Sequence, residues 1–246
     1  MRPKLAEFVE KKLPDFHLKR LQSLESLKLR SVLGRKNPYL FRAKNSGRAD
    51  ELVGEVLDAF LSSKEETVFG AFLEAIVIKA CELSFKGRKS SAEGIDLEFE
   101  RDKFLYLVSI KSGPNWGNSQ QILRMRDNFK RAKKVLGTNA DKRSVVAVNG
   151  CCYGRDTKPD KGDYLKLCGE AFWTHVSGDA TLYVDLIEPL GKQAKERNED
   201  FKREYAKVRN RFTKQFLDEF CSPDGEIDWT CIVKLGSANA KPAKSK

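Results

Sequence analysis

Histidine is scarce in this sequence, since its 246 residues include only His17 and His175. Two such positions are a poor basis for a histidine-rich zinc site, an HExxH protease or an HNH-type nuclease. The six cysteines show no CxxC spacing, which argues against a zinc ribbon and a thioredoxin motif. Long hydrophobic runs are also missing: no stretch of about 18 apolar residues occurs, so the sequence excludes a transmembrane helix.

The first residues, MRPKLAEFVEKKLP, contain neither the apolar centre nor the small-residue cleavage site of a secretory signal. We therefore expect a cytoplasmic protein whose cysteines are reduced thiols. A membrane partner is not expected, because no basic amphipathic helix is accompanied by a lipid-anchor signal. No small-molecule cofactor is expected either.

Positive charge is in excess: 46 Lys and Arg residues stand against 35 Asp and Glu residues, which gives a formal net charge of +11. A basic surface attracts polyanions, and nucleic acid is the commonest of these. An ordinary basic globular protein explains the charge equally well, because 40% hydrophobic and 33% charged residues are an ordinary globular composition. The charge favours a nucleic-acid partner without deciding it.

The order of helical and extended patterns predicts an α/β fold of the α+β kind, with a mixed central sheet flanked by helices. We expect four regions along the chain: an N-terminal helical region at 1–61, a core with the sheet at 62–188, a C-terminal helical region packed on the core at 189–235, and a disordered basic tail at 236–246.

Local signals set the expected helix boundaries. Pro14 interrupts the helical pattern of residues 4–33 and predicts two separate helices there. Ser63-Lys64-Glu65-Glu66 matches the S-x-x-E capping box, which predicts the start of a helix that ends near Ser84. Further helices are expected at residues 48–61, 119–136, 163–176, 180–188 and 190–220, so a break is expected between 61 and Ser63.

Three segments are typical of strands. Residues 93–100 alternate between apolar and acidic side chains, and residues 104–112 are largely apolar. The link between these two segments is short enough for an antiparallel hairpin. Residues 143–149 form a third apolar strand, so the predicted sheet contains a hairpin and one later strand.

The hairpin brings together side chains that can do chemistry. If its centre is near residue 102, Asp96 lies opposite residues 108–111, where Ser109 and Lys111 share one face. A carboxylate there can hold Mg²⁺, a hard cation that prefers oxygen ligands. The lysine can orient or deprotonate a water and steady a phosphate oxygen. Glu74, within an apolar helical run, can supply a second carboxylate.

Structural explanations of these residues stay open. Glu74 can instead form a salt bridge inside a buried helix, with Lys79 or Arg88 as its partner. Lys111 can instead be a lysine that keeps a strand at the sheet edge soluble.

The arrangement resembles the PD-(D/E)XK nuclease superfamily, through Glu74, Asp96 and the triplet Ser109-Ile110-Lys111. This resemblance implies that Mg²⁺, or Mn²⁺ in its place, is held by Asp96, the Ile110 backbone carbonyl and another acid, while Lys111 positions the attacking water. The sequence departs from the superfamily at Ser109, where an acidic residue is usual. The acids that can replace it are Glu74, Glu98 and Asp127.

A wider resemblance extends over about residues 36–235. The segments that carry it are KNPYLFRAKN (36–45), SSKEETVFGAFLE (62–74), VSIKSGPNWGNSQQ (108–121), VNGCCYGRD (148–156) and GEAFWTHVSGD (169–179). Together they look like type II restriction endonucleases of the PmeII-like group. That resemblance implies a restriction-endonuclease-like fold and Mg²⁺-dependent cleavage of double-stranded DNA at a short sequence. The usual assembly in such a family is a homodimer.

Polar residues near the expected site are candidates for DNA contact. Amides suit adenine edges and phosphates, and loop cations suit phosphates. The candidates are Asn115, Trp116, Asn118, Gln120 and Gln121 after the second strand, and Lys36, Asn37, Tyr153 and Arg155 in other loops. Packing under the loop also explains Trp116, a helix N-cap also explains Asn118, and ordinary solvation also explains the four residues in the other loops.

Two further functions stay open at this point. One is a structure-specific repair or junction nuclease with the same fold, which would cut branched or mismatched DNA. The other is a non-catalytic DNA-binding protein whose site has decayed at Ser109.

Overall fold

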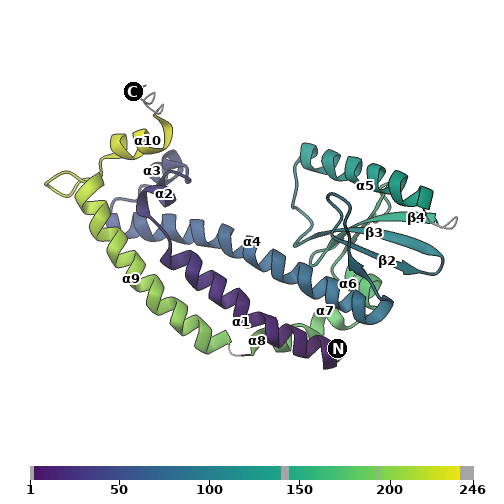
Figure 1. Cartoon of the computed structure of the whole chain (residues 1–246). Helices are drawn as coiled ribbons and strands as arrows, with labels where there is room; N and C mark the ends of the chain where they lie inside the picture. Colours follow the sequence, from purple (N-terminus) through teal and green to yellow (C-terminus); the bar gives the residue numbers. More distant parts are fainter. Residues whose placement is uncertain (1–2, 140–143, 193, 239–246) are drawn as a thin grey trace, which may run out of the picture. The chain divides into compact units, whose positions relative to one another are not determined.

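The computed structural model describes residues 3–139, 144–192 and 194–238 (Figure 1). The chain divides into two compact units, which interleave along the sequence. Unit 1 consists of Met1–Pro14 and Phe69–Lys192, and unit 2 consists of Asp15–Val68 and Gln193–Lys246. The sequence predicted consecutive regions instead, because periodicity shows where an element lies and does not show which distant element it packs against.

Helices make up most of the described chain. In chain order they are α1 (Pro3–Glu25), α2 (Leu29–Leu33), α3 (Pro38–Ala43), α4 (Ala49–Phe85), α5 (Ser119–Asn139), α6 (Glu170–Ser177), α7 (Leu182–Asp185), α8 (Ile187–Gly191), α9 (Ala194–Phe220) and α10 (Trp229–Ser237). No helix of the described residues is long and apolar enough to cross a membrane.

Unit 1 is built on a mixed sheet. Among its described residues five strands occur in the order β1 (Arg88–Lys89), β2 (Leu97–Arg101), β3 (Phe104–Lys111), β4 (Ser144–Cys151) and β5 (Leu165–Cys168). The pairs β1–β2 and β2–β3 are antiparallel, whereas β3–β4 and β4–β5 are parallel. This topology confirms the predicted α/β fold with a mixed sheet and flanking helices.

The predicted hairpin is formed by β2 and β3. Its turn consists of Asp102 and Lys103, whose φ angles of 52° and 69° are those of a tight two-residue turn. The pairing sets Leu97 opposite Val108. Asp96, one residue earlier, therefore lies at the level of Ser109, as the sequence predicts.

Each face of the sheet has its own helical cover. Leu107 and Ala147 pack with Met125 and Phe129 of α5 in one apolar cluster, and Figure 1 shows α5 along this face. The opposite face is so close to α6 that a side chain at Gly150 would overlap the Phe172 ring. Both faces are thus buried around the central strands, which holds the ends of β3 and β4 in place.

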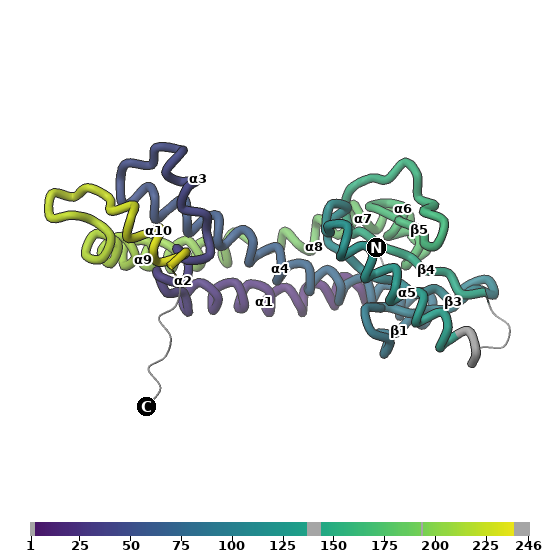
Figure 2. Tube along the Cα trace, turned by 90° about the horizontal axis from the view of Figure 1, so that it is seen from above, coloured from purple at the N-terminus to yellow at the C-terminus, as the bar shows by residue number. Residues whose placement is uncertain are grey.

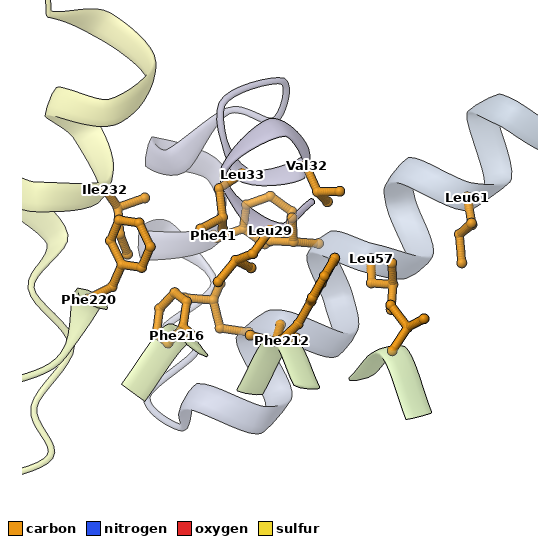
Figure 3. Close-up of a cluster of buried hydrophobic side chains, with 14 of the residues drawn as sticks. Leu29, Val32, Leu33, Phe41, Leu57, Leu61, Phe212, Phe216, Phe220 and Ile232 are labelled. Carbon is orange, nitrogen blue, oxygen red and sulfur yellow. The ribbon is translucent and has the colours of Figure 1, made fainter. Parts of the chain in front are cut away.

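Unit 2 contains a separate apolar core that joins distant helices (Figure 3). Phe212, Phe216 and Phe220 on α9 are buried, as their helical spacing predicts. Ile232 of α10 belongs to the same cluster. Figure 2 shows α2, α3 and α10 gathered together, in agreement with their contacts.

Both expected helix breaks are wrong. Pro14 lies inside α1, since the buried side chains of Leu5, Val9 and Leu13 keep one apolar stripe up to the proline. Such burial offsets the roughly 3 kcal/mol by which an interior proline disfavours a helix. Ser63 lies inside α4 and donates its hydroxyl to the carbonyl of Ala59, one turn back, instead of capping a new helix.

Other expected boundaries also differ. The predicted helix at 163–176 is wrong in its first part, because Leu165–Cys168 pairs with β4 and Gly169, with φ of 55°, turns the chain into α6. The first strand begins at Leu97 and not at residue 93. Helix α10 extends to Ser237, into the segment predicted as a disordered tail. Residues 239–246 of that predicted tail lie outside the described residues.

The tight packing of Gly150 gives a stability prediction. In Gly150→Ala the new Cβ would lie 2.0 Å from Cε2 of the fully buried Phe172. We expect the free energy of unfolding in urea to fall by about 1–3 kcal/mol, because overpacking forces neighbours to move. Gly70→Ala is the control: Gly70 lies in α4 with open space around its Cβ position, so stability should hold or rise. Equal effects of the two changes would contradict the close packing.

Candidate active site

Asp96 is tied to β3 through both its backbone and its side chain. Its N–H donates to the Val108 carbonyl at 2.9 Å, which continues the hairpin by one residue. Its carboxylate oxygen Oδ2 accepts a hydrogen bond from the Ile110 N–H at 2.6 Å. The carboxylate is therefore fixed beside the residue that precedes Lys111.

Asp96, Ser109 and Lys111 lie on the same side of the sheet. Opposite residues in an antiparallel pair share a face, and so do residues two apart on one strand. Lys111 is the last residue of β3 and is half-buried. The hairpin thus places one carboxylate and one ammonium at the same edge, on the face that α5 covers further along the strands.

Glu74 of α4 is a second carboxylate in this region. Its Oε1 lies 3.4 Å from Nζ of Lys89 on β1. The two ion-pair partners that the sequence suggested for Glu74 bind other acids: Lys79 lies 2.7 Å from Glu82, and Arg88 lies 2.7 Å from Glu98. The sequence predicted a buried carboxylate at Glu74, and the structure shows a half-buried one.

The environment raises the pKa of Asp96 above its usual value of 3.8. Burial is the largest cause, because it disfavours the charged form, and the negative charge of Glu74 acts in the same direction. The Ile110 hydrogen bond and the charges of Lys111 and Lys89 oppose this effect only in part. Glu74, Lys89 and Lys111 thus all lie near enough to act on the charge of Asp96.

Two of the acids proposed to replace the residue missing at Ser109 have other partners. Glu98 is buried and bound to Arg88 at 2.7 Å and to the Ser90 hydroxyl at 3.0 Å. Asp127 lies on the exposed side of α5, 4.0 Å from Lys130. Ser109 itself is buried, with an exposed fraction of 2%. Glu74 is the candidate whose charge acts on Asp96.

The loop after β3 contacts the site through Trp116. Its indole Nε1 donates to Oδ1 of Asn149 at 3.2 Å, and Nζ of Lys111 lies 5.0 Å from the centre of its ring. Sequence reasoning missed Asn149, although a lone amide in an apolar strand was a visible signal. It also missed Lys89, whose two-residue strand has no pattern that a sequence could reveal.

The other candidates for DNA contact fall into two groups. Asn118 and Gln121 bond each other's backbone N–H groups at 3.0 Å, which makes them a cap of α5. In unit 2, Nζ of Lys36 donates to the Ala59 carbonyl and Asn37 caps α3. The remaining four side chains are exposed: Asn115, Gln120, Tyr153, which lies against Gly113, and Arg155, which lines a cavity of about 1060 Å³ in unit 1.

The donors present suit Mg²⁺. The described residues contain no group of three or more His, Cys, Asp or Glu side chains that could hold a metal. Mg²⁺ does not need such a cage, because it is usually bound through one or two carboxylates together with substrate phosphates and water. Asp96 and Glu74 supply two carboxylates, and the Ile110 carbonyl points to the same side as the N–H that Asp96 accepts.

Comparison with known families decides the class of protein. The family described as type II restriction endonuclease EcoO109I matches residues 3–198, which is most of the chain. This chain belongs to that family. The match includes Glu74, Asp96 and Lys111, and no curated protein matches the sequence. The protein is therefore a restriction-type deoxyribonuclease, which confirms the prediction of a restriction endonuclease that acts on DNA. The family comparison does not name the PmeII-like group.

The raised pKa of Asp96 gives a prediction for the protein without metal. A buried acid whose pKa is raised by folding destabilises the fold above that pKa, and the effect disappears below the ordinary pKa of 3.8. Asp96→Asn should therefore raise Tm at pH 7, by about 2–4 °C for each kcal/mol recovered. Calorimetry in EDTA measures this. The gain should shrink as the pH falls toward 4, and a lower Tm of the variant at pH 7 would contradict the assignment.

Proposed function

We propose that this protein is a Mg²⁺-dependent type II restriction endonuclease that hydrolyses phosphodiester bonds of double-stranded DNA at a short specific sequence. The observation that carries the proposal is the shared sheet face of Asp96 and Lys111, with the Asp96 carboxylate bound to the backbone of the residue before Lys111. The family match supports it, because the matched family consists of restriction endonucleases.

The metal would be held by Asp96, Glu74 and the Ile110 carbonyl, with Mn²⁺ able to take the same place. When bound, the cation supplies charge neutralisation at the phosphate and stabilises the leaving 3′ oxygen. Glu74 takes the part of the acid that Ser109 lacks, and the electrostatic coupling of Glu74 to Asp96 supports this choice. We propose no role for Glu98 or Asp127 at the metal, since both have partners of their own.

Lys111 orients the attacking water and donates a hydrogen bond to a phosphate oxygen. Its ammonium lies at the end of β3, on the face that carries Asp96, so it can contact the phosphate to which the metal held by the carboxylates would bind. Lys89 offsets the negative charge of Glu74 and extends the positive field toward the DNA backbone. Asp96 must be deprotonated in order to bind the cation, and its raised pKa requires a higher pH for this than an ordinary aspartate does.

Substitution of the three charged residues tests the site. We expect Lys111→Ala, Asp96→Asn and Glu74→Gln each to reduce the cleavage rate by at least about 100-fold, because each removes a group aimed at the reacting phosphate. Binding of duplex DNA in a gel shift without metal should stay within a few fold of that of the unchanged protein.

Asp127→Asn is the matched control, because Asp127 is an exposed acid on α5 with its own ion pair. It should cut at the unchanged rate. If Asp127→Asn abolishes cleavage and Glu74→Gln does not, the second ligand has been assigned wrongly. If Lys111→Ala and Asp96→Asn both cut normally, the chemistry lies elsewhere.

Several finer properties belong to the proposal. We infer a homodimer acting on a two-fold symmetric sequence, as the resemblance to type II restriction endonucleases implies. A cytoplasmic location stays an expectation from the sequence. Asn115, Gln120, Tyr153 and Arg155 are the proposed DNA contacts, supported by their exposure or by their place beside the strand ends. Asn118, Gln121, Lys36 and Asn37 have the structural contacts described above, which favours a supporting role for them.

Plasmid digestion distinguishes the proposal from its alternatives. With Mg²⁺ we expect discrete DNA fragments, whose ends identify the recognition sequence. Cleavage limited to branched or mismatched duplexes would instead indicate a structure-specific nuclease. Binding without fragments in either Mg²⁺ or Mn²⁺ would indicate a decayed site, the alternative that Ser109 in the place of an acid favours. Either of these two results would contradict the proposed activity.

A further inference from the structure

We infer that Trp116 is a positioning residue, which holds the Lys111 ammonium over the scissile phosphate instead of contacting DNA itself. The inference rests on the proposed function of Lys111 and extends it to the loop after β3. It changes the role expected for Trp116, which the sequence suggested as a DNA contact.

The first support is the contact between the two side chains. Nζ of Lys111 lies 5.0 Å from the centre of the Trp116 ring. A cation within about 6 Å of an indole face is attracted by the negative face of the ring, and tryptophan is the strongest partner of this kind. Lys111 is half-buried, so water screens the attraction less than it would at an exposed site.

The second support is the anchor of the indole. Nε1 of Trp116 donates to Oδ1 of Asn149 at 3.2 Å, and Asn149 is buried, with an exposed fraction of 1%. The other end of this amide, Nδ2, lies 3.4 Å from the carbonyl of Ser109, its partner in the pairing of β3 with β4. The buried amide therefore links the strand that carries Lys111 to the ring beneath its ammonium.

The third support is the fixed position of the loop. Trp116 packs against the apolar cluster between the sheet and α5. Pro114 lies against Gly154 in the loop after β4, and its carbonyl accepts a hydrogen bond from Nζ of Lys166 at 3.1 Å. These contacts hold the loop on several sides, so the ring is a rigid surface for the lysine.

Lys111 needs such a surface. A lysine side chain has four rotatable bonds, and at the end of a strand it can point to many places. Catalysis requires the reacting groups to be placed closely, and an error of about 1 Å can reduce the rate by about 100-fold. The indole restricts the ammonium to the sheet face that also carries Asp96.

The kinetic experiment compares Trp116→Leu with Trp116→Phe, using a linear duplex that the unchanged protein cuts. Under single-turnover conditions with saturating protein, Trp116→Leu should cut about 10-fold to 100-fold more slowly. Trp116→Phe keeps an aromatic face but loses the Asn149 hydrogen bond, so its rate should lie between that of Trp116→Leu and that of the unchanged protein. The affinity for the duplex, measured without divalent metal, should change less than about 2-fold in both variants.

Trp229→Leu is the matched control. Trp229 lies in unit 2, where Arg42 stands 5.5 Å from its ring centre, so the same type of contact is removed in the unit that does not contain the candidate site. Its saturating rate should equal that of the unchanged protein. If Trp116→Leu weakens DNA binding while its saturating rate stays unchanged, Trp116 is a DNA contact and the inference is overturned.

A second measurement does not depend on activity. The chain contains three tryptophans, so protein labelled with ¹⁵N-tryptophan should give three indole N–H signals, assigned by substitution of each tryptophan with phenylalanine. In metal-free, DNA-free protein, Lys111→Met should shift the Trp116 signal and leave those of Trp173 and Trp229 in place. An unmoved Trp116 signal would overturn the inference even if Lys111 proves essential. If the unchanged protein cuts no DNA, the proposed function fails separately, and the signal still reports the contact.

Discussion

One hydrogen bond, from the Ile110 N–H to the Asp96 carboxylate, fixes the relation between the charged groups of the candidate site. It joins the residue just before β2 to the residue just before Lys111, so the carboxylate and the ammonium are held at one level of the sheet. The tight turn at Asp102 and Lys103 sets the register on which this bond depends. A slip of one residue would turn every side chain of one strand to the opposite face. The proposed chemistry therefore depends on the register of the hairpin.

The charged form of Asp96, which the proposed function requires, is disfavoured by its surroundings in the folded protein. Burial and the charge of Glu74 both raise the pKa of Asp96, and Lys89 and Lys111 offset this only in part. A folded protein tolerates such a group when a ligand or a reaction needs it. In the proposed function this ligand is a divalent cation, held by the carboxylates of Asp96 and Glu74. Ser109 stands where the superfamily pattern has an acidic residue, so one carboxylate is missing on β3. Glu74 is the candidate replacement whose charge acts on Asp96.

The parts of the fold that follow from local rules could be predicted. The hairpin, the core-facing phenylalanines of α9 and the helix after the second strand depend on alternation, helical spacing and a short link. Local rules failed at Pro14, where burial of the preceding apolar residues offsets the breaking signal. They failed at Ser63 as well, because its hydroxyl bonds back to the Ala59 carbonyl inside α4 instead of capping a new helix. They also failed at Leu165–Cys168, which forms a strand because β4 offers it a partner.

By itself, the amino-acid sequence determined the hairpin and the shared face of Asp96 and Lys111, because turn length and the two-residue period of a strand are local properties. Only the tertiary structure decided which residues lie next to these groups. Lys89 forms an ion pair with Glu74, and Asn149 accepts a hydrogen bond from Trp116. Asn149 is brought level with Ser109 by a parallel pairing of strands 40 residues apart. Such long-range contacts arise from the burial of both sheet faces, which no local pattern records.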